Sequence, residues 1–152
     1  MKLAEALALR SDHKKRMAAY TDRLVRSAKV QEGDRPLEDP TKLLKEFDAL
    51  ADEHEALIAR INRTNLAVRL ADGRTLTEAI AKRDVLVMRI GTYRRLIADA
   101  SVGQIRGTRT EIKIVPTVDV ARLQRETDAM SKAHRELDTA IQGANWTADL
   151  LD

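Results

Sequence analysis

The chain has 152 residues, of which 34% are charged and only 3% aromatic, a composition that suits one domain built from long helices with narrow apolar seams. Its 27 Lys and Arg residues against 24 Asp and Glu residues give a net charge of +3, too small by itself to indicate a nucleic-acid-binding protein. The absence of cysteine excludes disulfides, thiolate metal sites and cysteine nucleophiles. Six glycines and three prolines are too few for the many turns of a sandwich or barrel.

The N-terminal sequence has only a brief likeness to a signal peptide. Glu5 and Arg10 interrupt an apolar stretch that is already short. No run approaches the roughly 18 apolar residues that a membrane span needs, and the longest covers residues 85–88. We therefore expect a cytoplasmic protein without a membrane span.

Apolar residues at three-and-four spacing predict a first helix over residues 3–28. After a loop, Asp39 has the side chain of an N-cap, and Pro40 suits the first position of a second helix. The apolar seam of this helix runs to Ile61. The polar residues 62–65 are predicted to end it, since amide and hydroxyl groups can satisfy the last carbonyls of a helix.

A small β-hairpin or strand element is predicted next to these helices. Residues 66–70 alternate between apolar and polar, and Asp72-Gly73 is a favourable hairpin turn, which together predict a hairpin over about residues 66–76. Residues 110–115 alternate in the same way and predict a second strand.

Two further helices are predicted after the hairpin. Thr75 and Glu78 form a capping box for a third helix, which extends to about residue 100. Thr117 is predicted to cap a fourth helix, whose seam ends at Ile141. The third helix is expected to turn inward Leu76, Ala79, Ile80, Leu86, Val87, Ile90, Tyr93 and Ile97.

The second and fourth helices also match each other in sequence. Shifting residues 39–65 by 80 positions produces nine identical pairs, including Asp39/Asp119 and His54/His134. The fold class predicted is therefore mostly α: four long helices as two antiparallel, bundle-like hairpins, within a single domain 1–152 that contains tandem hairpins 1–65 and 75–146. The alternative is that two heptad-patterned, coiled-coil-like helices align because both are rich in Leu, Glu and Ala.

Six blocks follow one another in a familiar order: Lys29-Val30-Gln31-Glu32-Gly33, Ile61-Asn62-Arg63-Thr64-Asn65, Gly73-Arg74-Thr75-Leu76-Thr77, Arg109-Thr110-Glu111-Ile112-Lys113, Thr117-Val118-Asp119-Val120 and Asn145-Trp146. Together they resemble the septicolysin-like family of small bacterial proteins over nearly the whole chain. The resemblance implies a mostly helical cytoplasmic protein that oligomerises, with no established catalytic residues to carry over. The family label implies a cytolysin, yet the chain has no secretion signal or strongly apolar amphipathic helix. Where an aromatic residue is expected after Arg106, the chain has Gly107.

The histidines are the main candidate metal ligands, with Asp52, Glu53 or Asp138 as candidate carboxylate ligands beside them. A ferritin-like site needs Glu-x-x-His, and no glutamate stands three residues before any of the three histidines. His54 and His134, which are equivalent in the tandem match, are candidates for a zinc site on facing seams. The alternative is that each is a hydrogen-bonded polar residue that sets the register of a seam.

Polar residues where the predicted elements join are the candidate binding residues. Several are donors that could hold an anion or an acidic peptide, and the alternative for each is capping or a hydrogen bond between loops. Trp146 suits a plug at one end of the core or an interface anchor better than a platform for a ligand. The junction residues are Lys29, Gln31, Asn62, Arg63, Asn65, Arg106, Arg109, Lys113, Asn145 and Trp146.

No residues form a catalytic arrangement, so we expect no enzyme and no cofactor. The predicted function is a non-enzymatic structural or interaction protein whose partner is itself, in a homo-oligomer, because long helices with few aromatic residues bury little alone. A second hypothesis is a nucleic-acid-binding protein, since residues 2–29 hold eight basic and three acidic side chains, among them Lys14-Lys15-Arg16. Two more functions stay open, a metal- or small-molecule-binding enzyme and the cytolysin of the family label.

Overall fold

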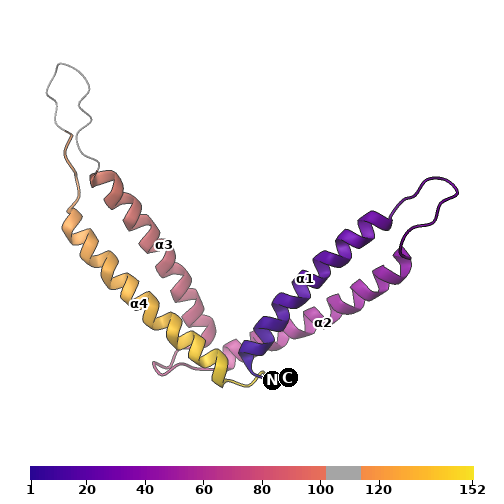
Figure 1. Cartoon of the computed structure of the whole chain (residues 1–152). Helices are drawn as coiled ribbons and strands as arrows, with labels where there is room; N and C mark the ends of the chain where they lie inside the picture. The colour runs from indigo at the N-terminus through magenta and orange to yellow at the C-terminus, as the bar shows by residue number, and fades with distance from the viewer. Residues whose placement is uncertain (102–113) are drawn as a thin grey trace, which may run out of the picture. The chain divides into compact units, whose positions relative to one another are not determined.

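Four α-helices make up the computed structural model, which describes residues 1–101 and 114–152 (Figure 1). They are α1 (Leu3–Ser27), α2 (Pro40–Ala67), α3 (Leu76–Ser101) and α4 (Val120–Thr147). The chain divides into two compact units. Unit 1 comprises Met1–Arg69 and Gln142–Asp152, and unit 2 comprises Leu70–Ile141. The prediction of a mostly helical chain with four long helices is confirmed.

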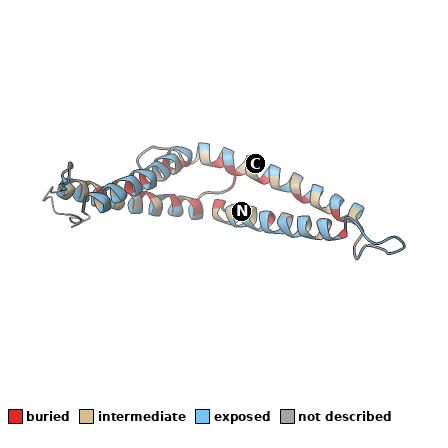
Figure 2. Ribbon diagram, turned by 90° about the horizontal axis from the view of Figure 1, so that it is seen from above, coloured by how far each residue is buried: buried red, intermediate tan, exposed pale blue. Residues whose placement is uncertain are grey.

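In unit 1, α1 and α2 pack side by side as a helical hairpin (Figures 1 and 2). The seam of α2 repeats every seven residues, with Leu43, Leu50 and Leu57 buried against α1 and followed by Ile61. Seven residues nearly complete two helical turns, so these side chains lie along one face. Burial of each leucine contributes about 1.5–3 kcal/mol, which makes this narrow seam the main stabilising feature of the hairpin.

In unit 2, α3 and the first part of α4 form a second hairpin. The buried residues of α3 are Leu76, Ala79, Leu86 and Ile90, as predicted. Arg83 crosses to Asp138 of α4, with 3.4 Å between Nη1 and Oδ1. The prediction for Val87 is wrong, because this side chain is 54% exposed.

The structure tests the predicted starts of three helices. Asp39 Oδ1 accepts from the amide of Thr41 at 2.9 Å, which confirms the cap before Pro40. The capping box of α3 is also present, since the Thr75 amide donates to Glu78 Oε2 at 2.7 Å. The prediction of Thr117 as the cap of α4 is wrong. Asp119 accepts from the amide of Arg122 at 2.9 Å instead, because a carboxylate two residues further on takes the same role as Asp39.

The prediction of a β-hairpin over residues 66–76 is wrong, because the chain turns here without forming strands. The chain does reverse at Asp72-Gly73, where the amide of Leu70 donates to the Arg74 carbonyl at 2.8 Å and Gly73 has φ 85°. However, the described residues hold only isolated bridge pairs and no strand. Leu66 and Ala67 belong to α2, so too few residues are left for a stable ladder.

The second predicted strand, residues 110–115, lies mostly outside the described residues. Its last two residues, Ile114 and Val115, are described; they have no regular secondary structure and are exposed. They therefore add no strand to the described part of the fold.

The prediction that residues 62–65 end α2 is also wrong, because the helix continues to Ala67. Thr64 is fully buried inside it, and its hydroxyl donates to the Arg60 carbonyl at 2.8 Å. This bond to the previous turn lets a threonine stay within a helix rather than cap it. The matching stretch of α4 behaves in the same way, since α4 runs through Asn145 to Thr147.

Candidate functional sites

The segment after α4 is held against the first residues of the chain in unit 1. Lys2 and Asp149 form an isolated antiparallel bridge. The amide of Leu3 donates to the Ala148 carbonyl at 3.0 Å, and Lys2 Nζ lies 2.8 Å from Asp149 Oδ1. The hydrogen bond from this ammonium lowers the pKa of Asp149.

The end of α2 holds the same segment from another direction. Arg60 Nε donates to the Leu151 carbonyl at 3.0 Å, and Arg63 Nε donates to the Asp152 carbonyl at 2.9 Å. Thr64 Oγ1 accepts from the amide of Leu151 at 3.0 Å. Arg63, predicted as an anion-binding donor, is therefore used in a contact within the chain.

The other predicted junction residues do not gather at one place. Lys29 and Gln31 lie exposed in the loop between α1 and α2, whereas Asn65 lies near the other end of α2, roughly 35 Å along a helix that rises about 1.5 Å per residue. No hydrogen bond between Asn65 and Asn145 occurs in the described structure, and Asn62 is exposed on α2. The remaining predicted residues, Arg106, Arg109 and Lys113, lie outside the described residues.

Trp146 does not plug the core, because it is 66% exposed on α4. Its role as an interface anchor or as a platform for a ligand stays a prediction. No sequence signal indicates this exposure, since a single aromatic residue near the end of a helical pattern fits either a buried or an exposed position.

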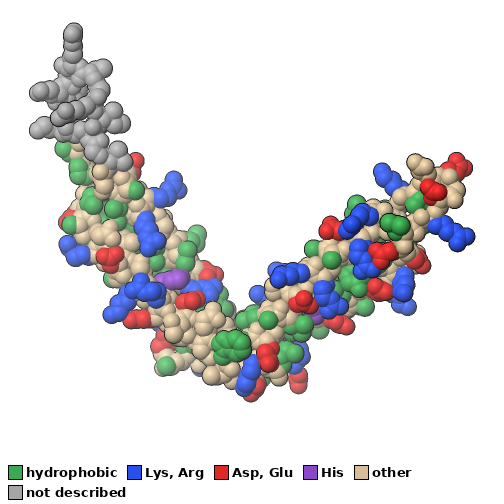
Figure 3. Space-filling model, viewed as in Figure 1, with side chains coloured by type: hydrophobic (Ala, Val, Ile, Leu, Met, Phe, Trp, Pro, Cys, Tyr) green, Lys and Arg blue, Asp and Glu red, His purple; other side chains and the backbone are tan. Residues whose placement is uncertain are grey.

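Part of the basic excess of α1 is neutralised within unit 1. Arg23 makes a two-point ion pair with Glu38 of the following loop, with 2.9 Å between Nε and Oε2, and this hydrogen-bonded guanidinium lowers the pKa of Glu38. The Arg23 guanidinium also lies 5.2 Å from the ring centroid of Tyr20, whose hydroxyl donates to Glu46. Acidic and basic side chains are interspersed along both hairpins on the face that Figure 3 shows.

Two histidines meet in the seam of unit 1. The ring centroids of His13 on α1 and His54 on α2 lie 5.7 Å apart with the rings tilted by 56°. Both Nδ1 atoms are buried and have no hydrogen-bond partner. Burial lowers the pKa of His54, helped by the nearby His13, Lys14 and Arg10. An unsatisfied buried polar atom costs about 1–3 kcal/mol, so this pair is an unusual feature for a helix seam.

The sequence predicts a different histidine pair, His54 with His134. His134 belongs to unit 2, where it lines a pocket with Arg94 and Arg135. His13 was missed as a partner because it interrupts the apolar pattern of the first helix without any spacing motif. No cluster of three or more His, Cys, Asp or Glu side chains suited to a metal occurs within residues 1–101 and 114–152.

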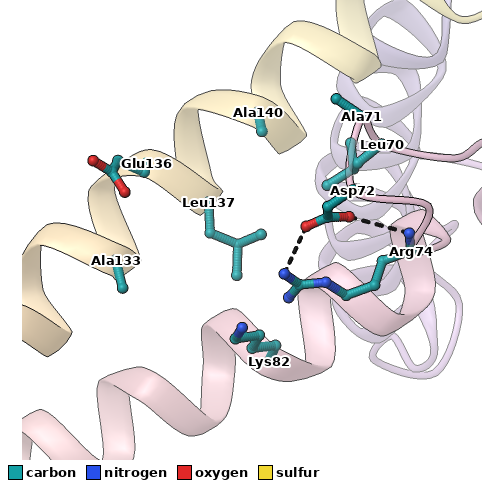
Figure 4. Close-up of a pocket in the computed structure, with 9 residues that line it drawn as sticks. All are labelled: Leu70, Ala71, Asp72, Arg74, Lys82, Ala133, Glu136, Leu137 and Ala140. Atoms are coloured by element: carbon teal, nitrogen blue, oxygen red, sulfur yellow. Dashed lines mark hydrogen bonds and ion pairs between the residues drawn. The ribbon is translucent and has the colours of Figure 1, made fainter.

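A groove of about 310 Å³ in unit 2 lies between the turn before α3 and the middle of α4 (Figure 4). Asp72 Oδ2 holds Arg74 Nη2 at 2.6 Å, while Arg74 Nη1 is buried without a partner. Lys82 and Glu136 line the same groove, so cations and carboxylates are mixed there. The lining offers no histidine or hydroxyl nucleophile, and we see no basis for a reaction in it.

The outer face of α3 is apolar as well as its inner face. Ala81, Val85, Met88, Thr92 and Leu96 follow four-three-four-four spacing and are all exposed; we call these five residues the outer stripe. Met88 is 71% exposed, Val85 45% and Leu96 41%. At 100° per residue the outer stripe lies roughly opposite the seam that contains Leu86 and Ile90. A helix that is apolar on two opposite faces is typical of one that is covered on both.

These features define a protein built from two-helix units, with an uncovered apolar helix face and no recognisable catalytic centre in its described residues. Residues 10–150 match the model of a family of unknown function (DUF6847), and the chain belongs to this family. The resemblance to septicolysin-like proteins is therefore wrong, and the cytolysin expectation that rested on it is withdrawn.

A solved structure is similar to this chain over nearly its whole length. The crystal structure of a functionally unknown conserved protein from Corynebacterium diphtheriae is similar to this chain, with 38% sequence identity, a TM-score of 0.88 and coverage of 99% of both chains. No curated protein matches the chain. Among the described helices, none is long and apolar enough to cross a membrane.

Proposed function

We propose that this protein is a non-enzymatic, self-associating helical protein, and that a second copy of the chain covers the outer stripe of α3. The observation that carries the proposal is the regular spacing of these exposed apolar residues. Three-and-four spacing over about four turns forms a coiled-coil seam rather than a scattered set of exposed side chains. Burial of Val85, Met88 and Leu96 against a partner helix would remove from water the largest side chains of the stripe.

The charges beside the stripe favour a second copy as the partner. Asp84 and Arg95 are eleven residues apart, close to three full turns, so they lie along the same edge of the outer stripe. When two identical helices pair antiparallel, equal edges face each other. A two-fold axis midway between these residues therefore brings Asp84 of each copy opposite Arg95 of the other, which makes the surface complementary to itself.

The same axis also brings small and large side chains of the outer stripe next to each other. It lies close to Met88, near the middle of the outer stripe, and it brings Met88 within about one residue of Thr92 of the second copy, while Val85 falls between Thr92 and Leu96 and Ala81 lies beside Leu96. Small and large side chains thus face each other, as close packing between helices requires. The supporting geometry comes from α3 alone and needs no contribution from unit 1.

Charge exchange across the pair tests this proposal. Asp84→Arg and Arg95→Asp each place like charges opposite each other in a homodimer, so each variant alone should self-associate less than the wild-type chain. An equimolar mixture of the two variants should restore association as a heterodimer, because every facing pair then has opposite signs. Native mass spectrometry of the mixture, with the variants distinguished by mass, measures this directly.

The outcomes distinguish two claims, that the chain self-associates and that Asp84 pairs with Arg95 in an antiparallel dimer. Asp84 already contacts its neighbour Arg83 at 2.9 Å, and Arg95→Asp controls for loss of that contact, since this variant keeps Asp84. A wild-type chain that is monomeric at micromolar concentration would contradict self-association. Wild-type dimers whose variants form no heterodimer would contradict the antiparallel pairing.

A further inference from the structure

A pair of imidazoles in the seam of unit 1, one buried and one partly exposed, has an arrangement that suits a metal ion. His13 is only 5% exposed and projects from α1, while His54 faces it from α2. Each ring has one buried nitrogen, Nδ1, without any hydrogen-bond partner. Buried imidazole nitrogens in proteins normally have hydrogen-bond partners, so two unpartnered nitrogens on neighbouring rings indicate that something else can bind them.

The distance between the rings agrees with shared coordination. A metal–nitrogen bond of about 2.0–2.1 Å places the centroid of a ligating imidazole about 3.2 Å from the ion. Two such rings have centroids about 5.2 Å apart at a tetrahedral angle and about 6.4 Å apart when they are collinear with the ion. The observed 5.7 Å between His13 and His54 lies inside this range.

We propose that His13 and His54 form a two-imidazole site for a transition-metal ion that prefers nitrogen ligands, with copper bound ahead of zinc. The preference follows from the donors present. No third His, Cys, Asp or Glu of the described chain completes the site, and imidazole nitrogen selects copper, nickel and zinc over magnesium and calcium. Among divalent ions, Cu²⁺ heads the affinity order for such donors. The positive charges of Lys14 and Arg10 act on His54 and oppose a divalent ion more than a monovalent one, which is a separate reason to include cuprous copper.

The site would link the two helices of the hairpin, because one ligand comes from each. A metal that binds the folded hairpin and not the unfolded chain raises the folding equilibrium constant about 100-fold at a free concentration 100 times its Kd. The stabilisation should therefore appear as a higher melting temperature of the whole chain, and it requires neither oligomerisation nor activity.

The test compares thermal unfolding of the purified chain with Cu⁺ under reducing conditions, Cu²⁺, Zn²⁺ or Mg²⁺. We expect copper to raise the melting temperature most, zinc less and magnesium not at all. His13→Gln and His54→Gln should each abolish the copper response, whereas His134→Gln, the matched control from unit 2, should keep it. The Cu²⁺-loaded wild type should also show nitrogen hyperfine coupling in its electron paramagnetic resonance spectrum, which a merely structural role of the histidines would not produce.

Two results would overturn the proposal. One is a wild-type chain whose melting temperature does not respond to copper. The other is a response that persists unchanged in the His13→Gln, His54→Gln double variant, which would assign the binding to other groups. Because glutamine keeps a polar side chain in the seam, the metal-free melting curves of the variants show whether they fold before metal is added.

Discussion

Single polar residues in unit 1 make contacts that no local sequence pattern indicates. Thr64 stands in a polar stretch typical of the end of a helix, yet it is buried and donates to Arg60 while it accepts from Leu151. Its two bonds join neighbouring turns of α2 to the segment after α4. A hydrogen bond to residue 151 cannot be inferred from local pattern, because the partner is 87 positions away.

Thr64→Val should destabilise the protein by about 0.5–1.5 kcal/mol, because it removes the hydroxyl that accepts the partly buried hydrogen bond from the Leu151 amide. Thr64→Ser keeps the hydroxyl and should lose less. Thr21→Val is the matched control: this exposed threonine also donates to the previous turn, at 3.0 Å to Met17, and its replacement should change stability by less than about 0.5 kcal/mol. Chemical denaturation measures all three. Equal losses for the two valine variants would contradict the role of Thr64.

The ion pair of Arg23 and Glu38 predicts a dependence on pH. The hydrogen bond from Arg23 lowers the pKa of Glu38 in the folded protein below its ordinary value of 4.5. The unfolded chain therefore binds this proton first, and the stabilisation is fully present above about pH 4.5 and lost as the pH falls through the lower folded value. Both groups are exposed, so the effect should be small.

The variant Glu38→Gln should lose only the contribution of this ion pair to the pH dependence of the free energy of unfolding. The other carboxyl groups should titrate as in the wild-type chain. The control variant, Glu32→Gln in the same loop, should keep the wild-type slope, because the exposed Glu32 has no ion pair in the described structure. Nuclear magnetic resonance titration of the carboxyl groups is the measurement. A Glu38 that titrates at an ordinary pKa would contradict the pairing.

At the scale of elements, regular apolar spacing predicts the helix seams, whereas polar residues predict some helix ends correctly and misplace others. The seams of α2 and α3 were readable because burial on one face demands an apolar residue every three or four positions. Asp39 and the Thr75–Glu78 pair were readable as caps because their bonds are local. The end of α2 and the cap of α4 were misplaced, since the same polar residue types serve as caps, as helix interior and as contacts to distant segments.

The outer stripe of α3 shows that apolar spacing alone does not tell which face of a helix is covered. The sequence contains two apolar faces on this helix, and it predicts an inward Val87, whereas this side chain is 54% exposed at the border of a pocket that Ile90 and α4 also line. Only the packing against α4 separates the covered face from the uncovered one. The histidine pair likewise needed the alignment of α1 with α2, because His13 and His54 share no motif in sequence.

At the scale of the whole molecule, residues 39–65 match the chain 80 positions further on at nine places. The helices α2 and α4 begin and end 80 residues apart, at Pro40 and Val120 and at Ala67 and Thr147, and each is preceded by a capping aspartate. That the chain is a tandem pair of helical hairpins stays a prediction. Each hairpin has only one seam, which leaves other helix faces for contacts, and the outer stripe is the most regular of these.

The central claim is that two copies associate antiparallel through the outer stripe, and a distance between identical spin labels tests it most directly. The chain lacks cysteine, so Thr77→Cys introduces a single labelling site on the exposed first turn of α3. A two-fold axis between residues 89 and 90 places the two labels roughly 40 Å apart along the helices, at about 1.5 Å per residue. The addition of Met88→Glu should abolish this distance, and Val87→Glu should preserve it. A chain that shows no intermolecular distance, or one below about 20 Å as parallel helices would give, contradicts the claim.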